Sequence, residues 1–250
     1  MRKPDVQGII NTAVMNEINA LETYNKLAKS YSDKIDYKPH NAFYDRPNTL
    51  SLLPEVAGKH VLDAGCGPGK YAEILMEKGA TVIGIDLSLR MIEEAVMRNG
   101  SNGEFTVHDL THPLGFEDQL FDIVICPLVL EYIYDWQPVF KEFNRVLKPQ
   151  GTFVFSITHP FSDYTYYKSK DYFTTEKVSA TWTGFGGAIE VESFRRSLMD
   201  CINPLIENGF TVDKILEPLP VPEFEKHDPK HFKELNEFPI FMCVRAVKNT

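Results

Sequence analysis

Short apolar stretches alternate with amphipathic helical patterns through the middle of the chain. The apolar stretches predict five buried strands because their apolar residues follow one another without a helical period. These strands are expected at His60–Asp63, Thr81–Asp86, Glu104–His108, Phe121–Cys126 and Thr152–Ile157. Apolar residues at helical spacing predict helices between them, at Tyr71–Lys78, Ser88–Arg98 and Val139–Leu147. Ser88 suits the N-cap of its helix.

The alternation continues less regularly toward the end of the chain. A helix is predicted over Ser197–Asn208, followed by strands near Phe210–Leu216 and Pro239–Val247. Strands and helices that alternate in this way are typical of a parallel sheet covered on both faces. The sequence therefore predicts an α/β fold, with a doubly wound, mostly parallel seven-stranded sheet and helices on both faces.

Two segments outside the alternation are expected to cover one end of the sheet. Residues 6–31 have apolar positions at helical spacing, and Asn48–Leu53 predicts a short helix that Pro54 stops. In the aromatic-rich stretch 160–195, Trp182–Gly187 resembles a hairpin tip. Ligands of such sheets bind beyond the carboxyl ends of the strands, so this insertion after the fifth strand predicts a lid. The expected organisation is a helical segment (1–53), an α/β core (54–159), a lid (160–196) and a C-terminal completion of the sheet (197–250).

A glycine-rich turn follows the first predicted strand, in Val61-Leu62-Asp63-Ala64-Gly65-Cys66-Gly67-Pro68-Gly69. Glycine is required where the backbone turns sharply or approaches a ligand without a Cβ in the way. The spacing is G-x-G-x-G, preceded by an acid, and differs from the G-x-G-x-x-G of dinucleotide-binding loops. The turn alone indicates a nucleotide-like ligand.

Two further acids stand at the ends of the next two predicted strands. Asp86 ends the second strand, where a carboxylate can accept hydrogen bonds from both hydroxyls of a ribose. Asp109 follows the third strand, where an adenine amino group would lie. Together with Asp63, these acids point toward one crevice at the carboxyl edge of the sheet.

The run from Asp63 to Pro160 resembles the class I S-adenosylmethionine-dependent methyltransferases, especially the small-molecule branch that includes ubiquinone- and menaquinone-pathway enzymes. The resemblance implies S-adenosylmethionine as cofactor and S-adenosylhomocysteine as product. It implies that the methionine part lies against Asp63 and the glycine turn, and that Asp86 holds the ribose. The full set of cofactor-binding residues expected from it is Asp63, Gly65, Cys66, Gly67, Gly69, Asp86, Leu87, Met91, Asp109, Leu110 and Pro127.

Three residues are candidates for the chemistry. Tyr31, with Tyr24 before it, lies in a segment similar to the family's N-terminal A-x-x-Y signature, whose tyrosine closes over the cofactor; the alternative is a packing role. His159 follows the fifth strand and can act as a base near neutral pH, or be a satisfied loop histidine. Glu131 follows the fourth strand where relatives frequently have His, and is a base, a binder of a cationic acceptor or a surface acid.

The predicted lid supplies the candidate substrate contacts. Arg195 could bind a substrate carboxylate through its guanidinium fork, or carry a charge at the start of a helix. Tyr24, Tyr166 and Trp182 are expected to line the lid, although aromatic residues in an insertion also form small cores of their own.

Composition and motif spacing limit the alternatives. A formal net charge of −9 disfavours sequence-independent nucleic-acid binding, which needs a basic surface. The four cysteines are far apart in the sequence and predict buried, reduced thiols with no metal site. A signal peptide and a membrane-spanning run are not apparent, so a cytoplasmic protein is expected.

These observations favour an enzyme that transfers a methyl group to an oxygen, nitrogen or carbon atom of a small molecule, as a monomer or homodimer. A nicotinamide-dependent oxidoreductase is disfavoured because G-x-G-x-x-G is absent. Two alternatives stay open. One is an RNA- or protein-modifying methyltransferase, although Cys126-Pro127-Leu128-Val129 lacks the Pro-Pro-aromatic motif of nucleic-acid amino methylases; the other is a non-catalytic S-adenosylmethionine-binding regulator.

Overall fold

The computed structural model describes residues 18–250, which form an α/β fold. The strands of its main sheet are β1 (His60–Ala64), β2 (Thr81–Asp86), β3 (Glu104–Val107), β4 (Phe121–Pro127), β5 (Leu147–Thr158), β8 (Phe210–Leu216) and β9 (Phe241–Lys248). They pair in the order β3-β2-β1-β4-β5-β9-β8, and β9 is antiparallel to both of its neighbours. The predicted seven-stranded, mostly parallel sheet is confirmed.

Residues that alternate along the central strands belong to two separate cores. Leu62 and Val124 pack into the larger core, against helices α6 (Gln137–Val146) and α8 (Leu198–Glu207). Their neighbours Val61 and Ile123 pack into the core on the other side of the sheet. That core is covered by α3 (Arg46–Ser51) and α4 (Lys70–Glu77). Apolar residues on both faces explain why these strands are continuously hydrophobic.

The connections between the strands follow the expected alternation with small shifts in the ends of the helices. Helix α5 (Leu89–Asn99) begins after Ser88, whose hydroxyl accepts a hydrogen bond from the Met91 amide, so the predicted N-cap is confirmed. The short helix expected at Asn48–Leu53 begins earlier, at Arg46, and continues from a π-helical turn, η1 (Asn41–Asp45).

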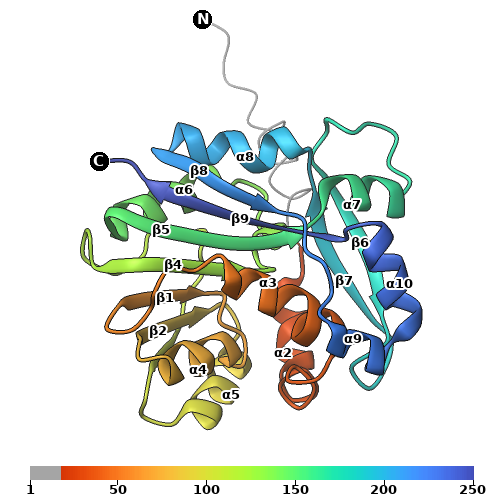
Figure 1. The fold of residues 1–250 in the computed structure, drawn as a ribbon, viewed down its shortest axis with the longest axis horizontal. Coiled ribbons are helices and arrows are strands. Elements are labelled where there is room, and N and C mark those ends of the chain that lie inside the picture. The colour runs from red at the N-terminus through yellow and green to blue at the C-terminus, as the bar shows by residue number, and fades with distance from the viewer. Residues whose placement is uncertain (1–17) are drawn as a thin grey trace, which may run out of the picture.

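One end of the sheet carries the additional elements (Figure 1). The insertion after β5 contains α7 (Pro160–Tyr166) and a two-stranded hairpin, β6 (Glu176–Trp182) and β7 (Ile189–Arg195), whose connecting turn lies in the predicted place. Helix α2 (Ala20–Ser32) lies at the same end and confirms the last part of the predicted N-terminal helix; residues 6–17 lie outside the described residues.

Besides α7, two more short helices at this end were not predicted, α9 (Pro222–His227) and α10 (Pro229–Glu237). Each is only two turns long and begins with a proline, so neither gives a strong periodic signal. They form a small third core with η1, built from Tyr44, Phe224 and Leu235.

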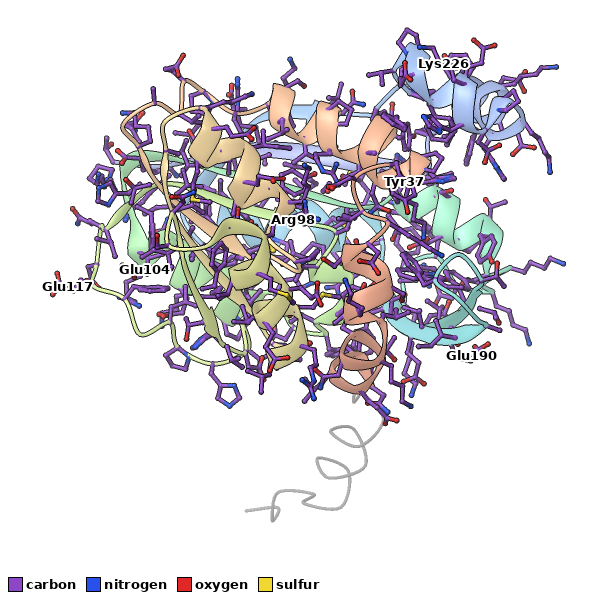
Figure 2. All side chains as sticks on the ribbon, turned by 90° about the horizontal axis from the view of Figure 1, so that it is seen from below. Tyr37, Arg98, Glu104, Glu117, Glu190 and Lys226 are labelled. Atoms are coloured by element: carbon purple, nitrogen blue, oxygen red, sulfur yellow. The ribbon has the colours of Figure 1, made fainter. Side chains whose placement is uncertain are left out.

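Charged side chains lie on the outside of the fold, as Glu104, Glu117 and Lys226 show in Figure 2. Arg98 joins α5 to its surroundings through ion pairs with Asp36 and Glu73. Within residues 18–250, no helix has the length and apolarity that crossing a membrane requires.

Candidate active site

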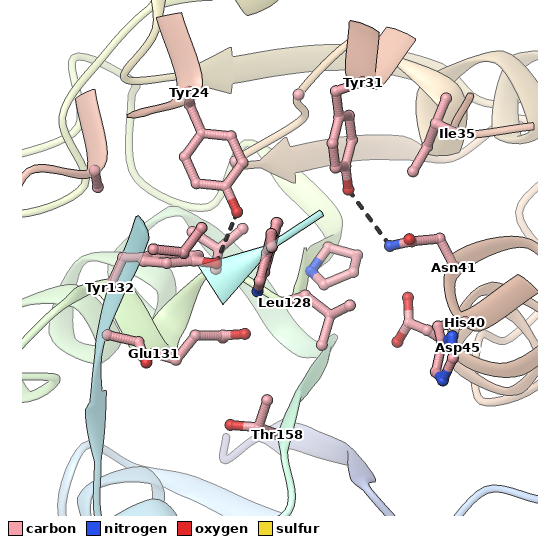
Figure 3. A pocket seen from close by; sticks show the side chains of 18 of the residues that line it. Tyr24, Tyr31, Ile35, His40, Asn41, Asp45, Leu128, Glu131, Tyr132 and Thr158 are labelled. Carbon is pink, nitrogen blue, oxygen red and sulfur yellow. Dashed lines mark hydrogen bonds between the residues drawn. The ribbon is translucent and has the colours of Figure 1, made fainter. Parts of the chain in front are cut away.

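A cavity of about 1390 Å³ lies at the end of the sheet that carries α2 and the hairpin. It is lined by the glycine turn after β1, the ends of β2 and β4, and residues from α2, η1 and the β6–β7 hairpin. Figure 3 shows Tyr24, Tyr132 and Glu131 on one side, with His40, Asn41 and Asp45 on the other. Ligand pockets usually measure about 300–1,000 Å³, so this cavity has room for two small molecules.

The glycine turn has the shape that the sequence predicted. Gly65, Gly67 and Gly69 all have positive φ angles, of 78°, 52° and 76°. A Cβ on Gly65 would overlap the γ-methyl groups of Val129 after β4, so the backbone here can lie close to β4 only as glycine. Gly69 is not part of the cavity lining: it is the N-cap of α4 and contacts Ala95 and Asn99 of α5, which makes it a packing residue.

Asp63 lies beneath this turn and is fully buried. Neither of its carboxylate oxygens has a hydrogen-bond partner among residues 18–250. Burial, followed by the charge of Asp86, raises the pKa of Asp63 to about 7, and the nearby Ala72 amide lowers it. A buried carboxyl group without partners is costly unless a ligand or its bound water supplies donors.

Asp86 connects the turn to the second strand. Its Oδ2 accepts a hydrogen bond of 2.9 Å from the Gly67 amide, and its Oδ1 accepts one of 2.8 Å from the Ser88 amide. The carboxylate is therefore held rigidly in the cavity wall, with its remaining lone pairs free to accept from a ligand. The other predicted cofactor-binding residues that line the cavity are Gly65, Cys66, Gly67, Leu87, Met91, Asp109, Leu110 and Pro127.

Three tyrosines line the cavity, Tyr24 and Tyr31 from α2 and Tyr132 from η2 (Leu130–Tyr132) after β4. The Tyr24 hydroxyl donates a hydrogen bond of 2.7 Å to Tyr132 Oη, and the two rings meet edge to face (Figure 3). The Tyr31 ring stacks on Phe185 of the hairpin turn, with centroids 5.1 Å apart. Lys34 Nζ also donates to the Gly184 carbonyl, at 2.7 Å. The end of α2 and the tip of the hairpin thus meet above the cavity.

Glu131 lies in a 3₁₀ turn after β4, η2 (Leu130–Tyr132), and lines the cavity although only 6% of it is exposed. Burial raises its pKa to about 8; the charges of Asp163 and Asp45 act in the same direction, while its own amide and Arg196 lower the value. None of the described residues donates a hydrogen bond to its buried Oε2. Glu131 is thus an acid of the cavity wall, and of its three predicted roles its burial rules out that of a surface acid.

Besides Asp63 and Gly69, two further predicted site residues do not line the cavity. His159 is the N-cap of α7: its Nδ1 accepts from the Phe161 amide, which leaves Nε2 to donate to Glu217, at 3.0 Å. Arg195 is fully buried, pairs with Glu176, and donates to the carbonyls of residues 171, 172 and 174. The prediction that His159 acts as a base is therefore wrong, and so is the prediction that Arg195 binds a substrate carboxylate. In both residues the polar atoms already have partners within the protein.

Other residues of the cavity escaped the sequence analysis. Asp45 accepts hydrogen bonds from Thr49 and Tyr71, and Asp163 accepts one from Thr158. Lys38 places its ammonium 3.5 Å from the centre of the Phe185 ring. None of these residues belongs to a recognisable motif, and only the folding of η1, α7 and the hairpin brings them together. Of the predicted lid residues, Tyr24, Trp182 and the exposed Tyr166 do line the cavity.

The residues present fit an adenosyl sulfonium. Asp63 lacks partners, glycine leaves the turn open, Asp86 is held at the end of β2, and tyrosine faces suit a cationic sulfur. Comparison with known proteins agrees with this chemistry. Residues 62–155 match the family model described as a methyltransferase domain.

Relatives support the same assignment. An uncharacterized protein of Haemophilus influenzae is 26% identical over 94% of this chain and 97% of its own length. The ubiquinone biosynthesis O-methyltransferase of Histophilus somni is 31% identical over 54% of this chain and 61% of its own. The crystal structure of an S-adenosylmethionine-dependent methyltransferase from Mesorhizobium loti has a TM-score of 0.67 and 26% identity, covering 86% of this chain and all of that one. Fold, site and relatives together identify the chain as a class I S-adenosylmethionine-dependent methyltransferase.

Proposed function

We propose that the protein transfers the methyl group of S-adenosylmethionine to a small molecule held within the cavity. The observation that supports this most directly is the shape of the cavity. Beyond the predicted cofactor residues, it extends to Asp45, Thr158, Asp163 and Trp182, beneath α2 and the hairpin. A deep volume that α2 and the hairpin partly cover suits a small acceptor better than a polymer, which needs a more open surface.

We assign the cofactor to the end of the cavity formed by the glycine turn and β2. Asp86 would accept from the ribose hydroxyls, the turn from Gly65 to Gly67 would contact the methionine part, and Asp63 would act from beneath the turn. Leu87, Met91, Asp109, Leu110 and Pro127 would contact the adenine side. The bound cofactor supplies an electrophilic methyl group on a positively charged sulfur.

The chain's own residues then position the acceptor, exclude water and handle its proton. We assign Tyr24, Tyr31 and the segment 160–196 to covering the site, since α2 and the hairpin turn meet above it. Glu131 takes the place proposed for His159 as the group that accepts a proton. Glu131 lines the cavity and has a buried carboxylate oxygen without a partner among residues 18–250, whereas His159 does not line the cavity and donates to Glu217.

The test uses purified protein and S-adenosylmethionine labelled in the methyl group. The protein is incubated separately with a low-molecular-mass cell extract, with RNA and with protein from the same cells. We expect label in the small-molecule fraction, and much less label in that fraction with an Asp86→Ala variant at a subsaturating cofactor concentration. Efficient labelling of RNA or protein, with none in the small molecules, would overturn the proposal.

A further inference from the structure

Two carboxyl groups, those of Glu131 and Asp163, belong to residues that line the cavity, and Glu131 lies on the side opposite Asp45 and His40 (Figure 3). Glu131 comes from η2 and Asp163 from α7, and both line the cavity. Burial raises the pKa of Glu131, and the charge of Asp163 adds to that rise. Among residues 18–250, the Asp163 carboxyl group accepts one hydrogen bond, of 2.6 Å, from Thr158 Oγ1 to Oδ2. Oε2 of Glu131 has no hydrogen-bond partner among the same residues.

The two arginines near this pair have their partners elsewhere, although Nε of Arg196 has none among residues 18–250. The Arg196 guanidinium donates to the carbonyls of Ile133 and Tyr134 and lies 3.9 Å from the centre of the Trp136 ring. Arg195 is held by Glu176 and backbone carbonyls. Over residues 18–250, no Lys, Arg or His nitrogen lies within 4.0 Å of either carboxyl group.

The remaining groups around the pair are neutral or acidic. The hydroxyls of Tyr24, Tyr132 and Tyr167 stay protonated, because burial raises the pKa of each above its usual value. Asp45 acts on Glu131 from across the cavity with the same sign as Asp163. Burial also raises the pKa of Asp163 to about 6, although Thr158 and Arg195 lower it. The wall thus has two acids and no counter-charge of its own in contact with them.

We infer, on the basis of the proposed function, that the methyl acceptor is an amine whose ammonium form binds between Glu131 and Asp163. An ammonium group brings a positive charge and several N–H donors, so it would satisfy Oε2 and offset the repulsion between the two carboxylates. The rings of Tyr24 and Tyr132 add faces that attract a cation. A hydroxyl group offers one donor and no charge, and a carboxylate would be repelled.

The same arrangement supplies the proton transfer that an amine requires. Glu131, ionised by the arriving cation, takes one proton from the ammonium and leaves a neutral amine with a free lone pair. The amine nitrogen then forms a bond to the methyl carbon, as the carbon–sulfur bond breaks and its electrons pass to sulfur. The methylated product is again cationic, and the proton on Glu131 passes to water when the product leaves.

The test compares two probes of the same shape, benzylamine and benzyl alcohol. Both are titrated calorimetrically at pH 7 into protein saturated with S-adenosylhomocysteine. We expect benzylamine to bind at least about tenfold more tightly, as a charge-assisted hydrogen bond in a desolvated site allows. Since Glu131 is largely protonated in the free protein, we expect close to one proton released per benzylamine bound, measured in two buffers of different ionisation enthalpy.

Three variants complete the experiment. Glu131→Gln should remove both the preference for benzylamine and the proton release. Asp163→Asn should reduce the preference, and Glu77→Gln, an exposed acid on α4, should leave both unchanged. Titration of each variant with S-adenosylhomocysteine shows that it is folded; should Glu131→Gln not fold, Asp163→Asn carries the comparison.

Benzyl alcohol binding as tightly as benzylamine, or no binding of either probe, would overturn the amine inference alone, because the protein still binds S-adenosylhomocysteine. Loss of the preference in Glu77→Gln as well would also overturn it. The proposed function would fail in a different experiment, the labelling test, if methyl label entered RNA or protein and not the small-molecule fraction.

Discussion

The hydroxyl of Tyr24 on α2 donates a hydrogen bond of 2.7 Å to Oη of Tyr132, which follows β4 and lies 108 residues further along the chain. This bond attaches the N-terminal helix to the wall of the cavity next to Glu131 (Figure 3). A Tyr24→Phe variant keeps the ring and removes the donor. We expect it to lose about 1 kcal/mol of docking energy for α2, which corresponds to a roughly fivefold higher KM for S-adenosylmethionine.

Steady-state kinetics measure this effect, with Tyr164→Phe as the control. Tyr164 lies on α7 and is not one of the residues that line the cavity. An unchanged KM in Tyr24→Phe would show that α2 stays in place without the bond.

Asp86 offers the sharpest test of where the cofactor lies. Its carboxylate already accepts from two backbone amides, so replacement with Ala removes the predicted ribose contact and also loosens the turn. We expect the affinity for S-adenosylmethionine and S-adenosylhomocysteine to fall about 10- to 100-fold, as for hydrogen bonds to a charged group. Calorimetric titration measures both ligands. Glu117→Gln, an exposed acid distant from the cavity, is the control, and equal affinities in the two variants would refute the placement.

Gly65 and Gly58 form a natural pair for testing the glycine turn. Both have φ near +70°, at 78° and 71°, so alanine is strained by about 1–2 kcal/mol at either position. Only at Gly65 would the new methyl group also collide, with Val129. We expect Gly65→Ala to lose about 1–3 kcal/mol more in the free energy of unfolding, and to bind cofactor poorly. Denaturant titration measures the free energy of unfolding of both variants. Equal losses would mean that the turn accommodates the new methyl group at Gly65 without an additional free-energy cost.

The buried acids make the free protein less stable as the pH rises. The pKa values of Asp163, Asp63 and Glu131 are raised to about 6, 7 and 8. Between its usual pKa and the raised value, each acid is protonated in the folded state and ionised in the unfolded state. The unfolded state then binds fewer protons, so stability falls with rising pH and levels off above the raised value.

Between pH 7 and 8, Glu131 contributes most of this loss, because Asp63 is already half ionised at pH 7 and Asp163 is almost fully ionised. We expect wild-type protein to lose up to about 1 kcal/mol of unfolding free energy across that unit of pH, and Glu131→Gln to lose markedly less. Urea denaturation at fixed pH without cofactor measures the slopes. Parallel slopes in the two proteins would mean that Glu131 is ionised throughout.

Local patterns in the sequence were sufficient to predict the fold and the end of the cavity to which we assign the cofactor. Continuous apolar strands alternate with amphipathic helices, and this periodicity requires a sheet covered on both faces. The carboxyl ends of β1 and β2 carry Asp63, the glycine turn and Asp86. Because the two strands are parallel, their carboxyl ends lie at the same edge of the sheet. Their meeting in space therefore follows from their order in the chain.

The acceptor end depended on the tertiary structure. His159 stands at the carboxyl end of a strand, as Asp86 does. However, α7 begins at Pro160, and the His159 imidazole caps the N-terminus of that helix. Arg195 ends β7 and is enclosed by the loop before β6, which takes up its donors. Glu131 and Asp163 come from separate elements, and their shared wall exists only once η2 and α7 are packed against the cavity. The spacing of apolar residues along the chain does not predict which way these side chains point. Their partners lie far away in the sequence, and tertiary packing brings them together.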